Sequence, residues 1–163
     1  MDVLKDLLRI KIFREQQAER ALLKARLILM EADDALKDAR SSLKKFTEES
    51  IEREKLMYSD LCSRLVFLKE IENVRLDVDL MKEKSDELKK KVEDAENRRV
   101  EAAEREESAR QVHIVAIRER EKFDELNSTF LEEHERKVAH FEELELEESA
   151  DSRFRFHGAS NEE

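Results

Sequence analysis

The stretch that decides the fold is "LLKARLILMEADDALKDARSSLKKF", residues 22–46. Alternating steps of three and four residues through it meet only apolar side chains: Leu22, Ala25, Leu29, Ala32, Leu36, Ala39, Leu43 and Phe46. A mean spacing of about 3.5 residues is typical of helices that wrap around each other in a left-handed coiled coil. The stretch therefore predicts a long helix whose seam, the line of these positions, packs on a partner helix.

The seam is less regular on either side of this stretch. Toward the N-terminus the same steps reach Ala18, Leu8 and Leu4, and toward the C-terminus they reach Met57. The positions that break the apolar pattern are Lys11, Glu15, Ser50 and Arg53.

The second half of the chain has a seam of its own. Every seventh residue from 74 to 130 is apolar: Val74, Met81, Leu88, Ala95, Ala102, Ala109, Ala116, Phe123 and Phe130. The alternate positions are mixed and include Arg99 and Glu106. This pattern predicts a second long helix.

The two seams complement each other if the chain reverses between them. In this register the facing pairs are Leu22 with Ala109, Leu29 with Ala102, Leu36 with Ala95, Ala25 with Glu106, Ala32 with Arg99 and Ala39 with Val92. Large side chains then oppose small ones, so the helices approach closely without voids. We expect an all-α fold, a long two-helix antiparallel coiled-coil hairpin with a longer second helix.

The expected domain organisation is a single coiled-coil hairpin over residues 1–150. Helix one covers about 3–61, the reversal about 62–68 and helix two about 68–149, followed by a flexible tail at 151–163. The reversal contains neither glycine nor proline, so side-chain caps from Asp60 or Ser63 are expected to help form it.

Composition supports this fold and excludes several partners. The 163 residues include no proline and one glycine, and 45% are charged, which leaves little to form turns or a globular core. A net charge of −10 disfavours nucleic acid and anionic membrane surfaces. Wholly apolar runs such as residues 27–30 are too short for direct membrane insertion. Charged residues interrupt any signal peptide, so we expect a cytosolic protein.

No pattern of catalytic or metal-ligating residues is present. His134 and His140 are six residues apart and lie on different faces of a helix. Glycine-rich phosphate loops and closed four-ligand zinc sets are missing. The single cysteine, Cys62, is expected to be half-buried near the turn. We therefore expect no enzyme activity, no cofactor and no metal.

Both ends of the chain carry more apolar residues than a seam can bury. Those of residues 3–13 spread around most of a helix, and the end of helix two projects beyond helix one with Phe130, Leu131, Val138, Phe141, Leu144 and Leu146. Exposed apolar patches mark interaction sites, although fraying with self-association, or a plug at the turn, would also explain them.

Residues 7–26, "LLRIKIFREQQAERALLKAR", resemble the N-terminal stretch of the YscO/FliJ family, the central stalk proteins of type III secretion and flagellar export. The matching features are the apolar start, Ile10-Lys11, Arg14, Ala18-Glu19 and the following alanines and leucines. The resemblance implies a stalk in the pore of a hexameric secretion ATPase, with its tip toward the membrane export gate. It also implies possible binding of secretion chaperones and a position at the cytoplasmic face of the inner membrane.

The resemblance assigns two sets of residues. The ATPase-facing set is Leu4, Leu7, Leu8, Ile10, Lys11, Phe13, Arg14, Phe123 and Phe130. The set facing the export gate, which rests on position alone, is Tyr58, Leu65, Val66, Phe67 and Leu68. Such a stalk couples ATP hydrolysis to export without hydrolysing ATP, and we expect a monomer when it is isolated.

Two other functions fit the sequence. One is a generic coiled-coil spacer or tether, formed by a parallel dimer of one continuous helix. The other is a helical chaperone-like binding module that holds unfolded clients.

Overall fold

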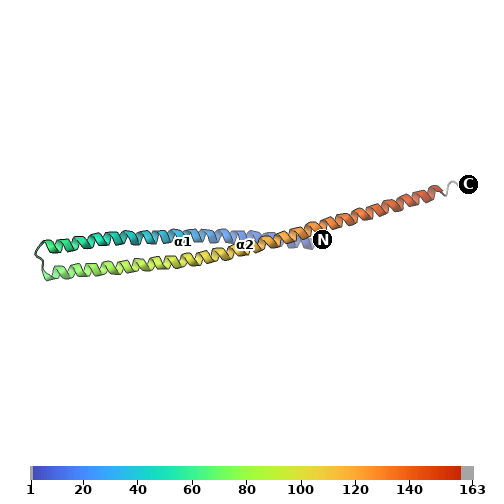
Figure 1. Cartoon of the computed structure of the whole chain (residues 1–163). Helices are drawn as coiled ribbons and strands as arrows, with labels where there is room; N and C mark the ends of the chain where they lie inside the picture. Colours follow the sequence, from blue (N-terminus) through green and yellow to red (C-terminus); the bar gives the residue numbers. More distant parts are fainter. Residues whose placement is uncertain (1, 159–163) are drawn as a thin grey trace. The chain divides into compact units, whose positions relative to one another are not determined.

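The computed structural model describes residues 2–158, and these form two α-helices (Figure 1). Helix α1 spans Asp2–Ser63 (62 residues) and helix α2 spans Leu68–Gly158 (91 residues). No strand occurs among the described residues. The expected all-α helical hairpin with a longer second helix is confirmed, and a single continuous helix, as the parallel-dimer spacer requires, does not fit it.

The helix ends differ in places from those expected. Helix α1 continues to Ser63, and α2 begins at Leu68. Helix α2 passes residue 149, where we expected it to end, and continues to Gly158, so residues 151–158 are helical. Residues 159–163 of the expected tail lie outside the described residues.

Within the hairpin, two compact units can be distinguished. Unit 1 combines Met1–Ala18 with His113–Glu163, and unit 2 is Glu19–Val112. Each therefore contains a segment of α1 and a segment of α2.

Unit 2 contains most of the buried seam. Leu22, Leu36, Val78 and Ala102 are at most 6% exposed, while nearly all other seam positions are half-buried. Three ion pairs join the two helices in this described unit, and the third is Arg40 Nη2 to Glu96 Oε1 at 2.9 Å. The other two are Arg26 Nε to Glu106 Oε1 at 3.4 Å and Arg99 Nε to Asp33 Oδ1 at 2.6 Å. Arg26 and Asp33 are the neighbours of Ala25 and Ala32, so these pairs agree with the expected register.

The seam loosens beyond Phe46, but the helix does not end there. Ser50 lies at a seam position with its hydroxyl buried and without a hydrogen-bond partner. An open groove of about 800 Å³ borders Phe46, Ile51 and Met81 at this level. A small polar residue at a seam position fills less space than leucine, which explains both features.

Candidate functional site

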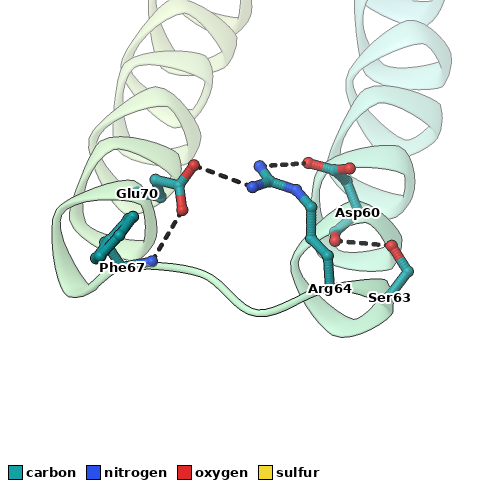
Figure 2. Close-up of polar contacts among 5 residues, drawn as sticks. All are labelled: Asp60, Ser63, Arg64, Phe67 and Glu70. Atoms are coloured by element: carbon teal, nitrogen blue, oxygen red, sulfur yellow. Dashed lines mark hydrogen bonds and ion pairs between the residues drawn. The ribbon is translucent and has the colours of Figure 1, made fainter.

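The reversal of the chain, called the tip here and comprising residues 58–70, is held by a network of polar contacts (Figure 2). The guanidinium of Arg64 donates to Asp60 Oδ2 at 3.2 Å and to Glu70 Oε1 at 3.1 Å, so it ties the end of α1 to the start of α2. The Ser63 hydroxyl donates to the carbonyl of Asp60 at 2.9 Å. The network fixes the reversal without glycine or proline.

Glu70 caps the start of α2. Its Oε2 accepts the backbone N–H of Phe67 at 2.9 Å, three residues earlier, which is half of a capping box. This hydrogen bond, followed by that from Arg64, lowers the pKa of Glu70. The bonds to Asp60 and Glu70 in turn raise the pKa of Arg64. Both groups are therefore held in their charged forms.

Apolar side chains of the tip face solvent. Leu65, Phe67 and Leu68 are fully or largely exposed, at 101%, 82% and 72%. Tyr58 is also exposed, at 47%, and Val66 is half-buried. Cys62, expected to be half-buried, is exposed, because the seam turns Leu61 inward instead. The tip thus presents apolar groups on a fixed backbone.

The second site is the paired end, which comprises α1 residues 2–18 and α2 residues 113–130 within unit 1. Its seam contains the charged residues that interrupted the sequence pattern. The Lys11 ammonium donates to Glu119 Oε2 at 2.6 Å and lies 5.1 Å from the ring centre of Phe123. Glu15 forms an ion pair with Arg120. Both misfits are thereby paired across the helices.

The bond from Lys11 also lowers the pKa of Glu119, mainly through the hydrogen bond itself and then through the charge of the ammonium. The Lys11 side chain is only 16% exposed, so this pair is partly withdrawn from water. Paired charges at a coiled-coil interface commonly specify which positions of two helices meet. We expect that role here.

The structure separates the ATPase-facing set into two groups. Leu4, Leu8, Lys11, Phe123 and Phe130 are half-buried in the seam. The exposed members are Leu7, Ile10, Phe13 and Arg14. The set is therefore not one surface: the first group holds the two helices together, and only the second is available to a partner.

Four exposed apolar residues near the start of α1 form a stripe. Val3, Leu7, Ile10 and Phe13 recur at helical spacing and are 73%, 38%, 47% and 55% exposed. We call these four residues the amino-terminal stripe. Val3 was missing from the predicted set, although a helical projection places it one turn before Leu7.

The third site is the overhang, residues 131–158 of α2. Every residue from Leu131 to Phe156 is exposed, whereas Phe130 is half-buried. Large apolar side chains in it include Leu131, Val138, Phe141, Leu144 and Leu146, at 41–70% exposed. The apolar surface expected at this end is therefore present, apart from Phe130.

Two kinds of feature do not occur in the described part of the chain. Among residues 2–158, no group of three His, Cys, Asp or Glu side chains could hold a metal ion. Neither described helix contains an apolar stretch long enough to cross a membrane.

Sequence reasoning missed the roles of Arg64, Glu70 and Glu119. Glu119 could not be chosen from the pattern, because the expected register places Arg120 opposite Lys11 and Glu119 only beside that position. Glu70 is the third residue of α2 and lies three residues after Phe67, at the capping-box position. Arg64 lies outside both helices, and nothing in the sequence indicates which carboxylates it reaches.

Known proteins of the same architecture are similar to this chain. A family model described as "Type III secretion protein YscO" matches residues 4–152. The crystal structure of type III secretion protein YscO from Vibrio parahaemolyticus is similar, with a TM-score of 0.81 and 26% sequence identity. That match covers 90% of this chain and 92% of the other. Among curated proteins, none matches the chain.

Proposed function

Because the chain belongs to the YscO family of type III secretion proteins, we propose that it is the non-enzymatic central stalk of an export apparatus. In this role it links a hexameric secretion ATPase to the export gate in the inner membrane, from the cytoplasmic side. The paired end enters the ATPase, and the tip faces the gate. The stalk transmits the effect of ATP hydrolysis and has no catalytic group of its own.

The observation that carries this proposal is the amino-terminal stripe. Its four apolar side chains lie outside the seam, so the hairpin itself leaves them in water. Burial of exposed apolar surface is the main favourable term in protein association. The pore of a ring-shaped ATPase would cover this stripe while leaving the hairpin intact.

The test measures phosphate release by the secretion ATPase of the same genome with and without the purified protein. The variant changes Leu7, Ile10 and Phe13 to Asp together, and a matched control changes the equally exposed Leu23 and Leu27 of unit 2 to Asp. We expect stimulation by the wild type and the control, but not by the variant. Leu8→Asp is unsuitable, since Leu8 is half-buried and its loss would weaken the hairpin itself.

Absence of binding and of stimulation by the folded wild-type protein would overturn the ATPase contact. Circular dichroism checks that all three proteins keep their helical content. Loss of stimulation in both variants would point to a general effect of added charge and would equally contradict the assignment.

The tip is the second contact in this proposal. Leu65 and Phe67 are the most exposed apolar residues there, and neither belongs to the Arg64 network through its side chain. Their replacement by Asp is expected to abolish secretion in cells while ATPase stimulation persists. Secretion at the wild-type level would contradict the proposed gate contact but not the proposed ATPase contact.

Binding of secretion chaperones fits the same exposed surfaces, and so does a chaperone-like module that holds unfolded clients. The two differ in specificity. A stalk that escorts chaperones should bind the chaperones of its own system and ignore an unfolded model client, such as reduced lactalbumin. Suppression of that client's aggregation would favour the chaperone-like function.

A further inference from the structure

The overhang has an unusual combination of apolar and acidic groups. Residues 141–151 contain six carboxylates, counting Asp151, and no basic residue. In the described part of the chain, none of these carboxylates takes part in an ion pair. Val138, Phe141 and Leu144 lie on one side of the same helix at spacings of three residues. A partner for this surface should therefore be apolar and basic.

The overhang also continues an established interface. In unit 1 the half-buried positions of α2 run through Phe123, Asn127 and Phe130 at steps of three and four. The same alternation continues through His134 and Lys137 to Phe141. The face that packs on α1 therefore extends past the first residues of α1, where it is exposed.

One surface of the required chemistry is present in the chain itself. The amino-terminal stripe is apolar, and residues 3–14 contain four basic residues and one acidic residue. Lys11 is occupied by Glu119, and Arg9 lies 3.6 Å from Asp6, but Lys5 and Arg14 form no ion pair within the described residues. The stripe and the overhang thus complement each other in charge and in hydrophobicity.

A single copy cannot bring these two surfaces together. Helix α2 is unbroken from Leu68 to Gly158, and its overhang begins beside the first residues of α1 (Figure 1). Without a reversal, the overhang leads away from the stripe of its own chain for about 40 Å at 1.5 Å per residue. A second copy, related by a twofold axis, can offer its stripe to the overhang and receive the other overhang in return.

We propose that a second copy of this chain covers the overhang in a reciprocal dimer. The acidic segment of each overhang packs along the amino-terminal stripe of the other copy, parallel to its α1. The first turns of the two overhangs pass each other in opposite directions at the twofold axis. Each dimer contains the contact twice, so two weak contacts together stabilise it.

The dimer has a functional consequence, and this consequence alone rests on the proposed function. The stripe that would enter the ATPase is covered in the dimer. The dimer is then a storage form from which the ATPase must capture a single copy. As the concentration of the stalk rises, stimulation of the ATPase would increase less than in proportion to it, because a larger fraction of the stalk is dimeric.

The dimer is tested by sedimentation velocity on the purified full chain at low salt, across a range of concentrations. We expect reversible dimers with a dissociation constant on the order of 10 µM. Phe141→Lys with Leu144→Lys should raise that constant by at least about tenfold, because it removes the apolar contact and adds like charge against the basic stripe. The matched control is Leu23→Lys with Leu27→Lys, equally exposed in unit 2, and should have no effect.

A charge reversal identifies the surfaces. Glu145→Lys with Glu148→Lys should weaken the dimer, and so should Lys5→Glu with Arg14→Glu. The chain that carries all four changes should dimerise again, since each overhang then meets a stripe of opposite charge. Salt near 1 M should weaken the wild-type dimer, because the screening length falls to about 3 Å.

Several outcomes would overturn the dimer. One is a wild-type protein that stays monomeric at low salt, the state expected from the sequence. Another is a dimer that persists when Phe141 and Leu144 are replaced. A third is failure of the variant with all four charge reversals to dimerise. If the wild type is monomeric but the ATPase protects the overhang from hydrogen exchange, the occupant is the ATPase, and the proposed function survives without the dimer.

Discussion

The seam of unit 2 and the seam of the paired end solve the same packing problem differently. In unit 2, the expected register opposes leucine on α1 to alanine on α2, and the most buried residues are apolar except for Glu106. In the paired end, Lys11 and Glu15 occupy seam positions and pair with Glu119 and Arg120. Both units pair charges across the helices, but in the paired end these charges lie at seam positions of α1, where residues 22–46 of unit 2 have only apolar side chains.

The difference teaches how register is specified. A uniform row of leucine and alanine tolerates a shift by one heptad, because each layer resembles the next. A lysine that must meet a glutamate does not tolerate that shift, since the charges would be left unpaired in a partly dry interface. We infer that unit 2 supplies most of the stability and that the paired end supplies most of the specificity.

The largest effect expected from this comparison belongs to Leu36→Ala in unit 2. Leu36 is 6% exposed, and its truncation leaves a gap against the facing alanine. We expect a loss of about 2 kcal/mol in the free energy of unfolding, at the low end for a buried leucine because only one helix covers it. Urea unfolding followed by circular dichroism measures it.

The control for that prediction is Leu27→Ala, on the same helix but 56% exposed. Its expected cost is below about 0.5 kcal/mol. Equal costs for the two truncations would show that burial in the seam does not stabilise unit 2.

The fold was predictable because the seam repeats many times. Each heptad of residues 22–46 gives the same information, so the period and the need for a partner helix survive local exceptions. The end of α2 was not predictable in the same way. Residues 149–156 lack seam spacing, but no glycine or proline interrupts them before Gly158, and Arg153 and Arg155 lie favourably near the negative end of the helix dipole.

The candidate site was predictable in its location more than in its composition. The steps back from Leu22 place Leu8 and Leu4 in the seam, which already separates them from Leu7 and Ile10. The tip required three-dimensional information, because Arg64 reaches one carboxylate on each helix. The burial of Glu106 also could not be read from the sequence, because a carboxylate opposite Ala25 can reach water, whereas its side chain is only 11% exposed.

The next largest effect is expected for Lys11→Glu in the paired end. The change removes the contact with Phe123 and places a second carboxylate beside that of Glu119. The loss of stability should be clear but smaller than that of Leu36→Ala. Adding Glu119→Lys restores an ion pair with the two charges exchanged and should recover most of the lost stability.

A urea series on the wild type, both single variants and the double variant measures the coupling between the two residues. If the double variant is as unstable as the sum of the single variants, the two residues do not interact. The pair would then have no part in fixing the register.

A smaller effect is expected for Glu106→Leu in unit 2. The carboxylate is buried and meets Arg26 and Arg110 at 3.4 Å, but both arginines are about half exposed and can return to water. Replacement of a buried charge by a leucine of similar volume is often neutral or stabilising. We expect a change between zero and about 1 kcal/mol in favour of the folded state. A marked loss of stability would show that unit 2, like the paired end, depends on its charges.

The smallest effect is expected at Glu70 and is confined to the tip. The pKa of Glu70 is lowered in the folded state, so its contribution is fully present above the ordinary value of 4.5 and is lost as the pH falls through the lowered value. The cap should therefore loosen only in acid. Glu70→Gln keeps an acceptor for the Phe67 N–H but removes the charge that Arg64 binds, so hydrogen exchange at the start of α2 should rise slightly and lose this acid dependence. Exchange that rises throughout α2 would mean that the cap stabilises the whole hairpin, and the tip would then be part of the fold's support instead of a local device that presents Leu65 and Phe67.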